Sequence, residues 1–278
     1  MSTVVDLSAG SGLPITLDTA TGLLSSPEAG VVGEPGVRRL GELRDVLRDP
    51  AVADSDPDRA CYLLYRDVRD ASGSLALGDA GLRYDLTVTL PGDYGDELPK
   101  TAGHYHGRAP DGVLFPEIYE VLHGSALFVL QRVNDAERAD PAVLSLWLAR
   151  CEPGDKIVIP PDCGHLTVNV GAGPLVVSDL VATASINDYG SYRSARGAAC
   201  HVLRHPSTPD GHTAAPNPRY PGAPDAARRP GNRWSPFLPD RGPLHTHAIQ
   251  TPDAFAFLLS PAGDAAAMFE LWAVSSER

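Results

Sequence analysis

The sequence predicts an all-β fold, preceded by a helix near the N-terminus and followed by a proline-rich C-terminal extension. From residue 61 to about residue 182, short apolar segments alternate with turn-forming clusters of Gly, Pro, Asp and Asn. Many short strands at this spacing favour an antiparallel sandwich or barrel over alternating β-α units. After residue 205 the composition shifts to Pro, Gly, Ala and Arg, which marks the extension.

The first sixty residues predict two kinds of element. Residues 13–24 read as a strand, a turn and a second short apolar run. Residues 36–50 have helical periodicity, which ends at Pro50 because proline cannot continue a helix. The apolar positions on the predicted helical face are Leu40, Leu43, Val46 and Leu47.

Eight strands are predicted in the central region, which we take as residues 61–205. They lie at residues 61–68, 82–90, 117–122, 125–133, 142–149, 156–160, 165–170 and 174–182. Residues 1–60 are expected to pack on these strands. The proline-rich part of residues 206–278 is expected to hold no regular ladder, and its short apolar runs to pack on the strands or on a partner subunit.

The overall charge and the apolar pattern limit the partners of the protein. The formal net charge of −12 disfavours a nucleic-acid or anionic-membrane partner. The four cysteines have no paired spacing, which favours reduced thiols. The N-terminus has neither a basic start nor a long apolar run, and eighteen apolar residues never follow one another. We therefore expect a soluble, cytoplasmic protein.

The candidate functional site is a His-x-His pair followed by a Glu. Alternate side chains of an extended strand share a face, so His104 and His106 point the same way. By the same rule, Glu117 and Tyr119 share a face of the strand that returns after a polar loop. A third imidazole, His165, follows a turn after the apolar strand at residues 156–160.

Three imidazoles and one carboxylate are suitable ligands for one divalent transition metal, such as Fe, Mn, Ni, Co or Zn. The sequence therefore predicts a metal held by His104, His106, Glu117 and His165. Cys163 is an alternative soft ligand, although such a cysteine is more often a small buried hydrophobe. A second His-x-His near the C-terminus lacks a nearby Glu and is not predicted to bind metal.

These segments resemble the paired motifs of the cupin superfamily, and within it the cupin-type phosphoglucose isomerases. The shared motifs are T-x-G-H-x-H, E-x-Y, P-P-x-x-x-H-x-T-V-N-x-G and D-Y-G, together with the run L-T-V-T-L-P-G upstream. The resemblance covers roughly residues 13–220. It implies a double-stranded β-helix, a small β-barrel with the site in its mouth, and a homodimer.

The resemblance also implies a reaction and roles for individual residues. The reaction is the isomerisation of an aldose phosphate to a ketose phosphate, most specifically glucose 6-phosphate to fructose 6-phosphate. Glu117 is implied as the base and Tyr119 as its neighbour at the sugar. The implied substrate contacts are Thr87, Thr101, Gly103 and Tyr189, with Lys100 as a replacement for a lysine that the family commonly has at the position of Ala102.

Three departures leave the substrate open. Besides Ala102, Asn187 stands where the family often has a His, and Val181 lies where a late strand has an aromatic. The alternatives are another metal-cupin enzyme, such as an oxygenase or an isomerase of a non-phosphorylated substrate, and a non-catalytic sugar-binding cupin. Proton transfer by Glu117 and a metal-mediated hydride shift also remain open at this stage.

Overall fold

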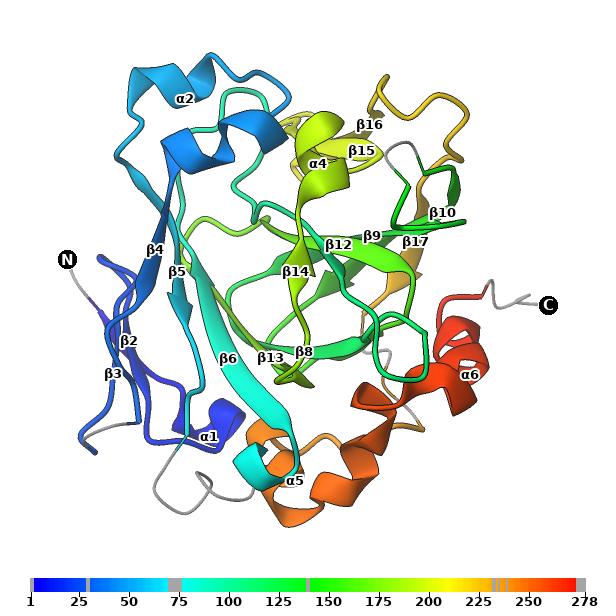
Figure 1. Ribbon diagram of the computed structural model, residues 1–278. Coiled ribbons are helices and arrows are strands. Elements are labelled where there is room, and N and C mark those ends of the chain that lie inside the picture. The colour runs from blue at the N-terminus through cyan, green and yellow to red at the C-terminus, as the bar shows by residue number, and fades with distance from the viewer. Residues whose placement is uncertain are drawn as a thin grey trace.

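Two β-sheets that face one another form the centre of the molecule (Figure 1). The computed structural model describes residues 3–28, 31–69, 77–138, 141–231, 234, 236–238 and 240–273. The six-stranded sheet has the order β11 (Lys156–Ile159), β8 (Glu117–His123), β13 (Leu175–Ala182), β6 (Leu82–Thr89), β5 (Ala60–Tyr65) and β4 (Gly36–Arg39). The four-stranded sheet has the order β12 (Cys163–Asn169), β9 (Ala126–Val133), β10 (Val143–Cys151) and β17 (Ala227–Pro230).

Smaller elements surround the two large sheets. The N-terminal sheet consists of β1 (Val4–Asp6), β2 (Thr16–Asp18) and β3 (Leu24–Ser25), and two pairs join β7 (Tyr105–His106) to β14 (Asn187–Asp188) and β15 (Cys200–Arg204) to β16 (His212–Pro216). The helices are α1 (Ser8–Ser11), η1 (Leu40–Val46), α2 (Val52–Ser55), α4 (Gly190–Ser194), α5 (Leu244–Gln250), η2 (Pro252–Leu258), η3 (Pro261–Gly263) and α6 (Ala265–Glu270). No helix in the described part of the chain has the length and hydropathy that crossing a membrane requires.

The all-β prediction is confirmed, and each of the eight predicted central strands is present within a few residues of its expected bounds. Apart from Val37 on β4 and Leu144 on β10, which are exposed, most apolar side chains of the large sheets are buried, and this accounts for the near-continuous apolar runs in the sequence. In the described residues, no hydrogen-bonded ladder connects the two large sheets. The architecture is therefore a cupin-type pair of facing sheets and not a closed barrel.

The predicted N-terminal helix is shorter and tighter than the sequence pattern indicated. Gly36–Arg39 forms the edge strand β4, because its backbone pairs with β5. The next seven residues form the 3₁₀ helix η1, which buries Leu40, Leu43 and Val46. Their spacing of three matches the three residues per turn of a 3₁₀ helix. Because β4 pairs with β5, the first turn of the expected α-helix is an edge strand instead.

The prediction that the proline-rich extension holds no regular ladder was wrong. His212–Pro216 pairs with β15, and Ala227–Pro230 adds a parallel edge strand to β10. Proline is tolerated at sheet edges and strand ends, where one ladder hydrogen bond is dispensable. Here β16 and β17 each end at a proline. The extension therefore continues the fold of the central region.

The C-terminal helices pack on the sheets, which is one of the two placements expected for the short apolar runs of the extension. Trp272 is fully buried, its ring lies 5.6 Å from that of Trp147, and its Nε1 donates to the Val158 carbonyl at 2.9 Å. The histidines of the second His-x-His have different partners: His245 contacts the Tyr84 ring, and His247 lies 2.9 Å from an Asp240 carboxylate oxygen.

Both lysines of the chain are buried in ion pairs. Lys156 lies 2.7 Å from Glu120, whose other carboxylate oxygen accepts a hydrogen bond from the Leu244 backbone and so ties α5 to the sheet. Lys100 lies 2.9 Å from Glu97 and donates to the Val46 carbonyl at 2.6 Å. These ion pairs connect segments that are far apart in the sequence.

Replacing Glu97 with Gln is expected to lower the free energy of unfolding by about 3–5 kcal/mol, because Lys100 would remain buried without its counter-charge. Although burial opposes the effect, Lys100 and His201 lower the pKa of Glu97 from 4.5 to about 2. A carboxylate with a lowered pKa stabilises the fold above its unfolded pKa, and that stabilisation is lost as the pH falls through its folded pKa.

Urea unfolding at neutral pH and between pH 4.5 and pH 2 tests this expectation. The wild type should lose stability across that window more steeply than Glu97→Gln. The exposed variant Glu137→Gln is the matched control and should follow the wild type. Equal stability of Glu97→Gln and the wild type at neutral pH would contradict the prediction.

Candidate metal centre

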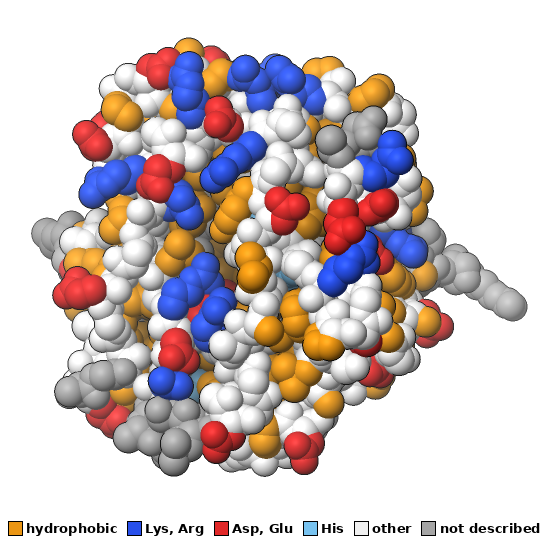
Figure 2. All heavy atoms as spheres, in the orientation of Figure 1, with side chains coloured by type: hydrophobic (Ala, Val, Ile, Leu, Met, Phe, Trp, Pro, Cys, Tyr) orange, Lys and Arg blue, Asp and Glu red, His pale blue; other side chains and the backbone are white. Residues whose placement is uncertain are grey.

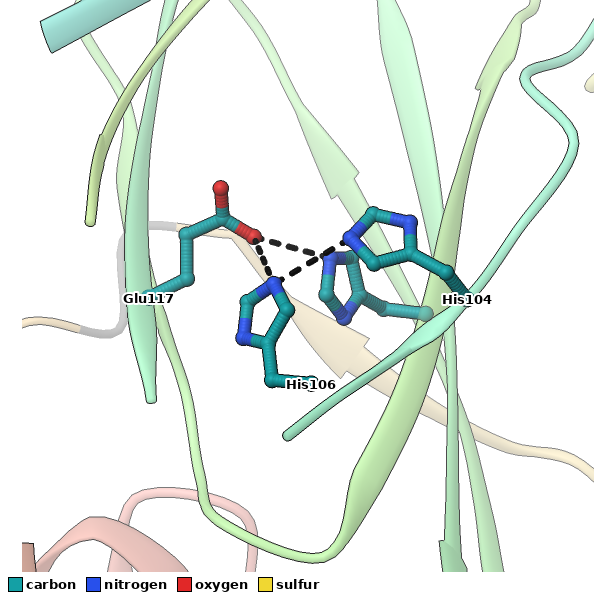
Figure 3. Close-up of side chains that lie close together, drawn as sticks. His104, His106 and Glu117 are labelled. Atoms are coloured by element: carbon teal, nitrogen blue, oxygen red, sulfur yellow. Dashed lines mark hydrogen bonds and ion pairs between the residues drawn. The ribbon is translucent and has the colours of Figure 1, made fainter. Parts of the chain in front are cut away.

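Three histidines and one glutamate converge inside the molecule. One nitrogen from each of His104, His106 and His165 and one oxygen of Glu117 lie within 4.8 Å of one another. Figure 3 shows His104, His106 and Glu117 pointing toward a common centre. The predicted convergence of these four side chains is present in the structure.

A short backbone pairing places two of the imidazoles side by side. His104 and His165 exchange both backbone hydrogen bonds, at 3.1 and 3.0 Å, and their rings lie 4.5 Å apart. Tyr105 points to the other side, where its hydroxyl accepts a hydrogen bond from Gln131. A Cβ at Gly164 would lie 2.5 Å from the Tyr105 ring, so only glycine fits beside it.

The donor set fits a metal ion. The His106 Nδ1 lies 2.9 Å from the Phe115 carbonyl, and the His165 Nδ1 lies 3.5 Å from the Cys163 carbonyl. A ring nitrogen that faces a carbonyl carries the proton, so the Nε2 of each ring presents a lone pair. These lone pairs face the Glu117 Oε2 at 3.5 and 2.9 Å. That buried oxygen has no hydrogen-bond donor among the described residues.

The imidazole lone pairs and the carboxylate oxygen that they face repel one another unless a cation lies between them. Burial also keeps the imidazoles neutral: it lowers the pKa of His106 to about 3 and that of His165 to about 4. Burial and the other two histidines lower the pKa of His104 as well. The group therefore could hold a metal, because neutral imidazole is the form that binds one.

Glu117 has further neighbours on its own strand and on the adjacent strand. Tyr119 lies two residues along β8, and its hydroxyl is 3.3 Å from the His165 Nε2. Asp179 on β13 is the cross-strand partner of Tyr119. Burial raises the pKa of Glu117 to about 7, against hydrogen bonds from Asp179 and Tyr119 that lower it. A carboxylate with this pKa is suited to exchange protons near neutral pH.

All the predicted site residues except Lys100 line a single cavity. They are His104, His106, Glu117, His165, Tyr119, Thr87, Thr101, Gly103 and Tyr189. Lys100 is held away from the cavity by Glu97 and Val46. Lys100 was expected to replace a lysine at the position of Ala102, but only Ala102 lines the cavity. The consecutive residues 101–104 all line it, so this segment does not alternate as a regular strand does.

Gly103 lines the cavity and also has a packing requirement. Its Cβ would lie 2.4 Å from the Tyr192 ring, which is in the core, so this glycine is required by packing and by its positive φ. The Thr101 hydroxyl accepts a hydrogen bond from the Thr167 backbone at 3.1 Å, which leaves its own hydrogen for a ligand. Tyr189 lies against His104, with the ring centroids 5.6 Å apart.

The sequence interpretation missed several charged residues of the cavity. Arg66, Arg83 and Asp179 line it, and Asp85 contacts both arginines. A usable signal was present, because Asp85 and Asp179 each stand in the middle of an apolar strand. A buried charge requires a partner, so such a residue indicates a polar site.

The fold and the site together define a cupin with a cluster of three His and one Glu that could hold a metal. The family model for glucose-6-phosphate isomerase (GPI) matches residues 37–219, and the chain belongs to this family. It is an isomerase family, so the chain is identified as an isomerase. The substrate named for the family is a sugar phosphate.

Relatives with the same name were found among curated proteins. The glucose-6-phosphate isomerase of Thermococcus onnurineus (strain NA1) is 30% identical over 172 residues, which is 60% of this chain and 80% of that protein. The enzyme of Thermococcus litoralis is 26% identical over 182 residues, which is 64% of this chain and 82% of that protein. Among solved structures, oxalate oxidase with the substrate analogue glycolate matches 36% of this chain and 41% of that chain, at 20% identity and a TM-score of 0.27. That overlap is too small to carry an argument.

Proposed function

We propose that this protein interconverts glucose 6-phosphate and fructose 6-phosphate with one divalent transition metal held by His104, His106, Glu117 and His165. Family membership supports the reaction. The observation that carries the proposal is the position of Glu117, which belongs both to the cluster and to the cavity wall beside Tyr119. Fe, Mn, Ni, Co and Zn are the candidate ions for this donor set.

A metal held by these four side chains would supply Lewis acidity toward the sugar. Glu117 moves a proton between C2 and C1 from its position in the cavity wall beside Tyr119. Tyr119 places its hydroxyl next to His165 and orients the sugar oxygens. Burial of these groups excludes water and so limits loss of the transferred proton.

The phosphate is assigned to the end of the cavity lined by Thr87, Thr101 and Gly103, with Tyr189 over the sugar. The Thr101 hydroxyl keeps a hydrogen to donate, as described above. Lys100 has no place in this assignment, because its ammonium is occupied by Glu97 and Val46.

The reaction is tested by incubating metal-loaded protein anaerobically with a panel of aldose phosphates and measuring ketose phosphate. Turnover of glucose 6-phosphate without oxygen supports the proposal. A protein that binds metal but converts no sugar phosphate would favour a different metal-cupin activity. The observation that favours this second candidate is that Val181 and Asn187, two departures from the family pattern, both line the cavity.

We also propose a cytoplasmic homodimer, since the family resemblance implies pairing of two subunits. Light scattering should give twice the chain mass of 29.4 kDa. A metal-loaded protein that scatters as a single chain would contradict this assignment.

A further inference from the structure

Two arginines line the end of the cavity away from Thr87. Arg66 follows β5 directly and Arg83 is on β6. Their side chains are 43% and 25% exposed, so they lie where the cavity meets solvent. Figure 2 shows basic side chains gathered near the middle of this face, next to apolar ones.

A buried carboxylate fixes both guanidinium groups. The Asp85 side chain is 1% exposed and accepts hydrogen bonds from Arg66 Nη1 and from Arg83 Nε, the latter at 2.9 and 3.1 Å to its two oxygens. It also accepts from the Asp67 backbone at 2.8 Å. Asp85 is the one carboxylate within the described residues that hydrogen-bonds to these two guanidinium groups, so it accounts for one of their two positive charges. Arg66 also interacts electrostatically with Asp179 and Glu117.

The arginines also have unused donors. Within the described residues, neither terminal nitrogen of Arg83 has a hydrogen-bond partner, and Arg66 uses only Nη1. A planar guanidinium with fixed orientation and free N–H groups binds oxyanions in a forked geometry. Arg66 and Arg83 are therefore preorganised to bind an anionic oxygen.

The strand register places Arg83 in the same row of the sheet as Glu117. Arg83 and Glu117 are both cross-strand partners of Val181, so they share one row of the sheet. Neighbouring strands lie about 4.8 Å apart, which puts the two backbones about 10 Å from one another. Thr87 is four residues further along β6, about 13 Å from Arg83. The backbone of Arg83 is thus nearer to that of Glu117 than to that of Thr87, which lines the proposed phosphate position.

We propose that Arg66 and Arg83, held by Asp85, bind the oxyanion at C1 of the bound sugar. This inference rests on the proposed isomerisation. Glu117 takes the proton from C2, the C2–H electron pair becomes the C1=C2 double bond, and the carbonyl pair of C1 moves to O1. The proton then returns to C1 while the O2 proton passes to O1 and C2 becomes the carbonyl. The arginines stabilise the charge on O1 between these steps.

The same site is expected to recognise a stable anion at C1. Aldonic acids that carry a distal phosphate present a carboxylate there, whereas the corresponding alditol phosphates present a neutral hydroxyl. The preference for the acid over the alcohol measures the subsite and cancels the phosphate contribution, which is common to both ligands.

Calorimetric titration of metal-loaded protein with gluconate 6-phosphate and glucitol 6-phosphate tests the inference. The variants are Arg66→Gln and Arg83→Gln, each of which leaves one arginine on Asp85, and Arg150→Gln is the exposed control. The preference for the acid should fall about tenfold or more in each cavity variant, since a charge-assisted hydrogen bond is lost. Arg83→Lys should recover part of it. Metal content and near-ultraviolet circular dichroism report on folding.

Two outcomes overturn the inference. An unchanged preference for the acid over the alcohol in both cavity variants would mean that other groups bind the carboxylate. An equal loss of affinity for acid and alcohol would assign the arginines to the phosphate instead. Isomerase turnover of the same wild-type preparation separates this result from the proposed function. If the wild type is active and the variants keep the preference, only the inference is contradicted. If the wild type is inactive and the variants lose the preference, only the isomerase assignment is contradicted.

Discussion

Replacement of Glu117 with Gln is expected to lower kcat by at least about a hundredfold, the usual size of a general-base effect. Gln keeps an oxygen close to the three imidazoles but has no carboxylate to accept the proton. The metal content should therefore remain near that of the wild type while turnover is lost. Initial rates of fructose 6-phosphate formation, measured together with the metal content, check this expectation.

The exposed variant Glu137→Gln is the matched control for Glu117→Gln. It makes the same chemical change outside the cavity and should retain wild-type kcat. A Glu117→Gln enzyme that keeps its metal and turns over at a near-normal rate would favour the hydride shift. In that case Glu117 would be only a ligand.

Replacement of His165 or His104 with Ala is expected to remove most of the bound metal. The loss of a second-shell partner typically costs about 10- to 100-fold in metal affinity, and the loss of a direct ligand should cost at least as much. Elemental analysis of protein purified without a histidine tag should find close to one transition metal per chain in the wild type. Each variant should contain far less.

His205→Ala is the control for these variants, since His205 is exposed and lies outside the cluster. It should keep the wild-type metal content. An unchanged content in both His104→Ala and His165→Ala would remove the basis for the proposed metal centre. Stability in urea, measured on the same samples, separates a lost ligand from a lost fold.

Much of the candidate site could be predicted from local patterns. Period-two alternation placed His104 with His106 and Glu117 with Tyr119, because the direction of a side chain on a strand depends only on its own backbone. The eight central strands followed from short apolar runs separated by turn-forming clusters. The expected substrate contact of Lys100 is not formed, because Glu97 and the Val46 carbonyl hold its ammonium away from the cavity.

The sequence by itself determined the all-β class, the central strands and the four side chains of the metal cluster, since each follows from short-range periodicity or from motifs. Only the tertiary structure decided which distant segments pair. Pairing of β4 with β5 shortened the N-terminal helix, and β17 joined the sheet at β10. The register of β6, β13 and β8 put Arg83 in the row of Glu117. Register depends on the packing of residues far apart in the chain, and a shift of one residue would turn these side chains to the other face.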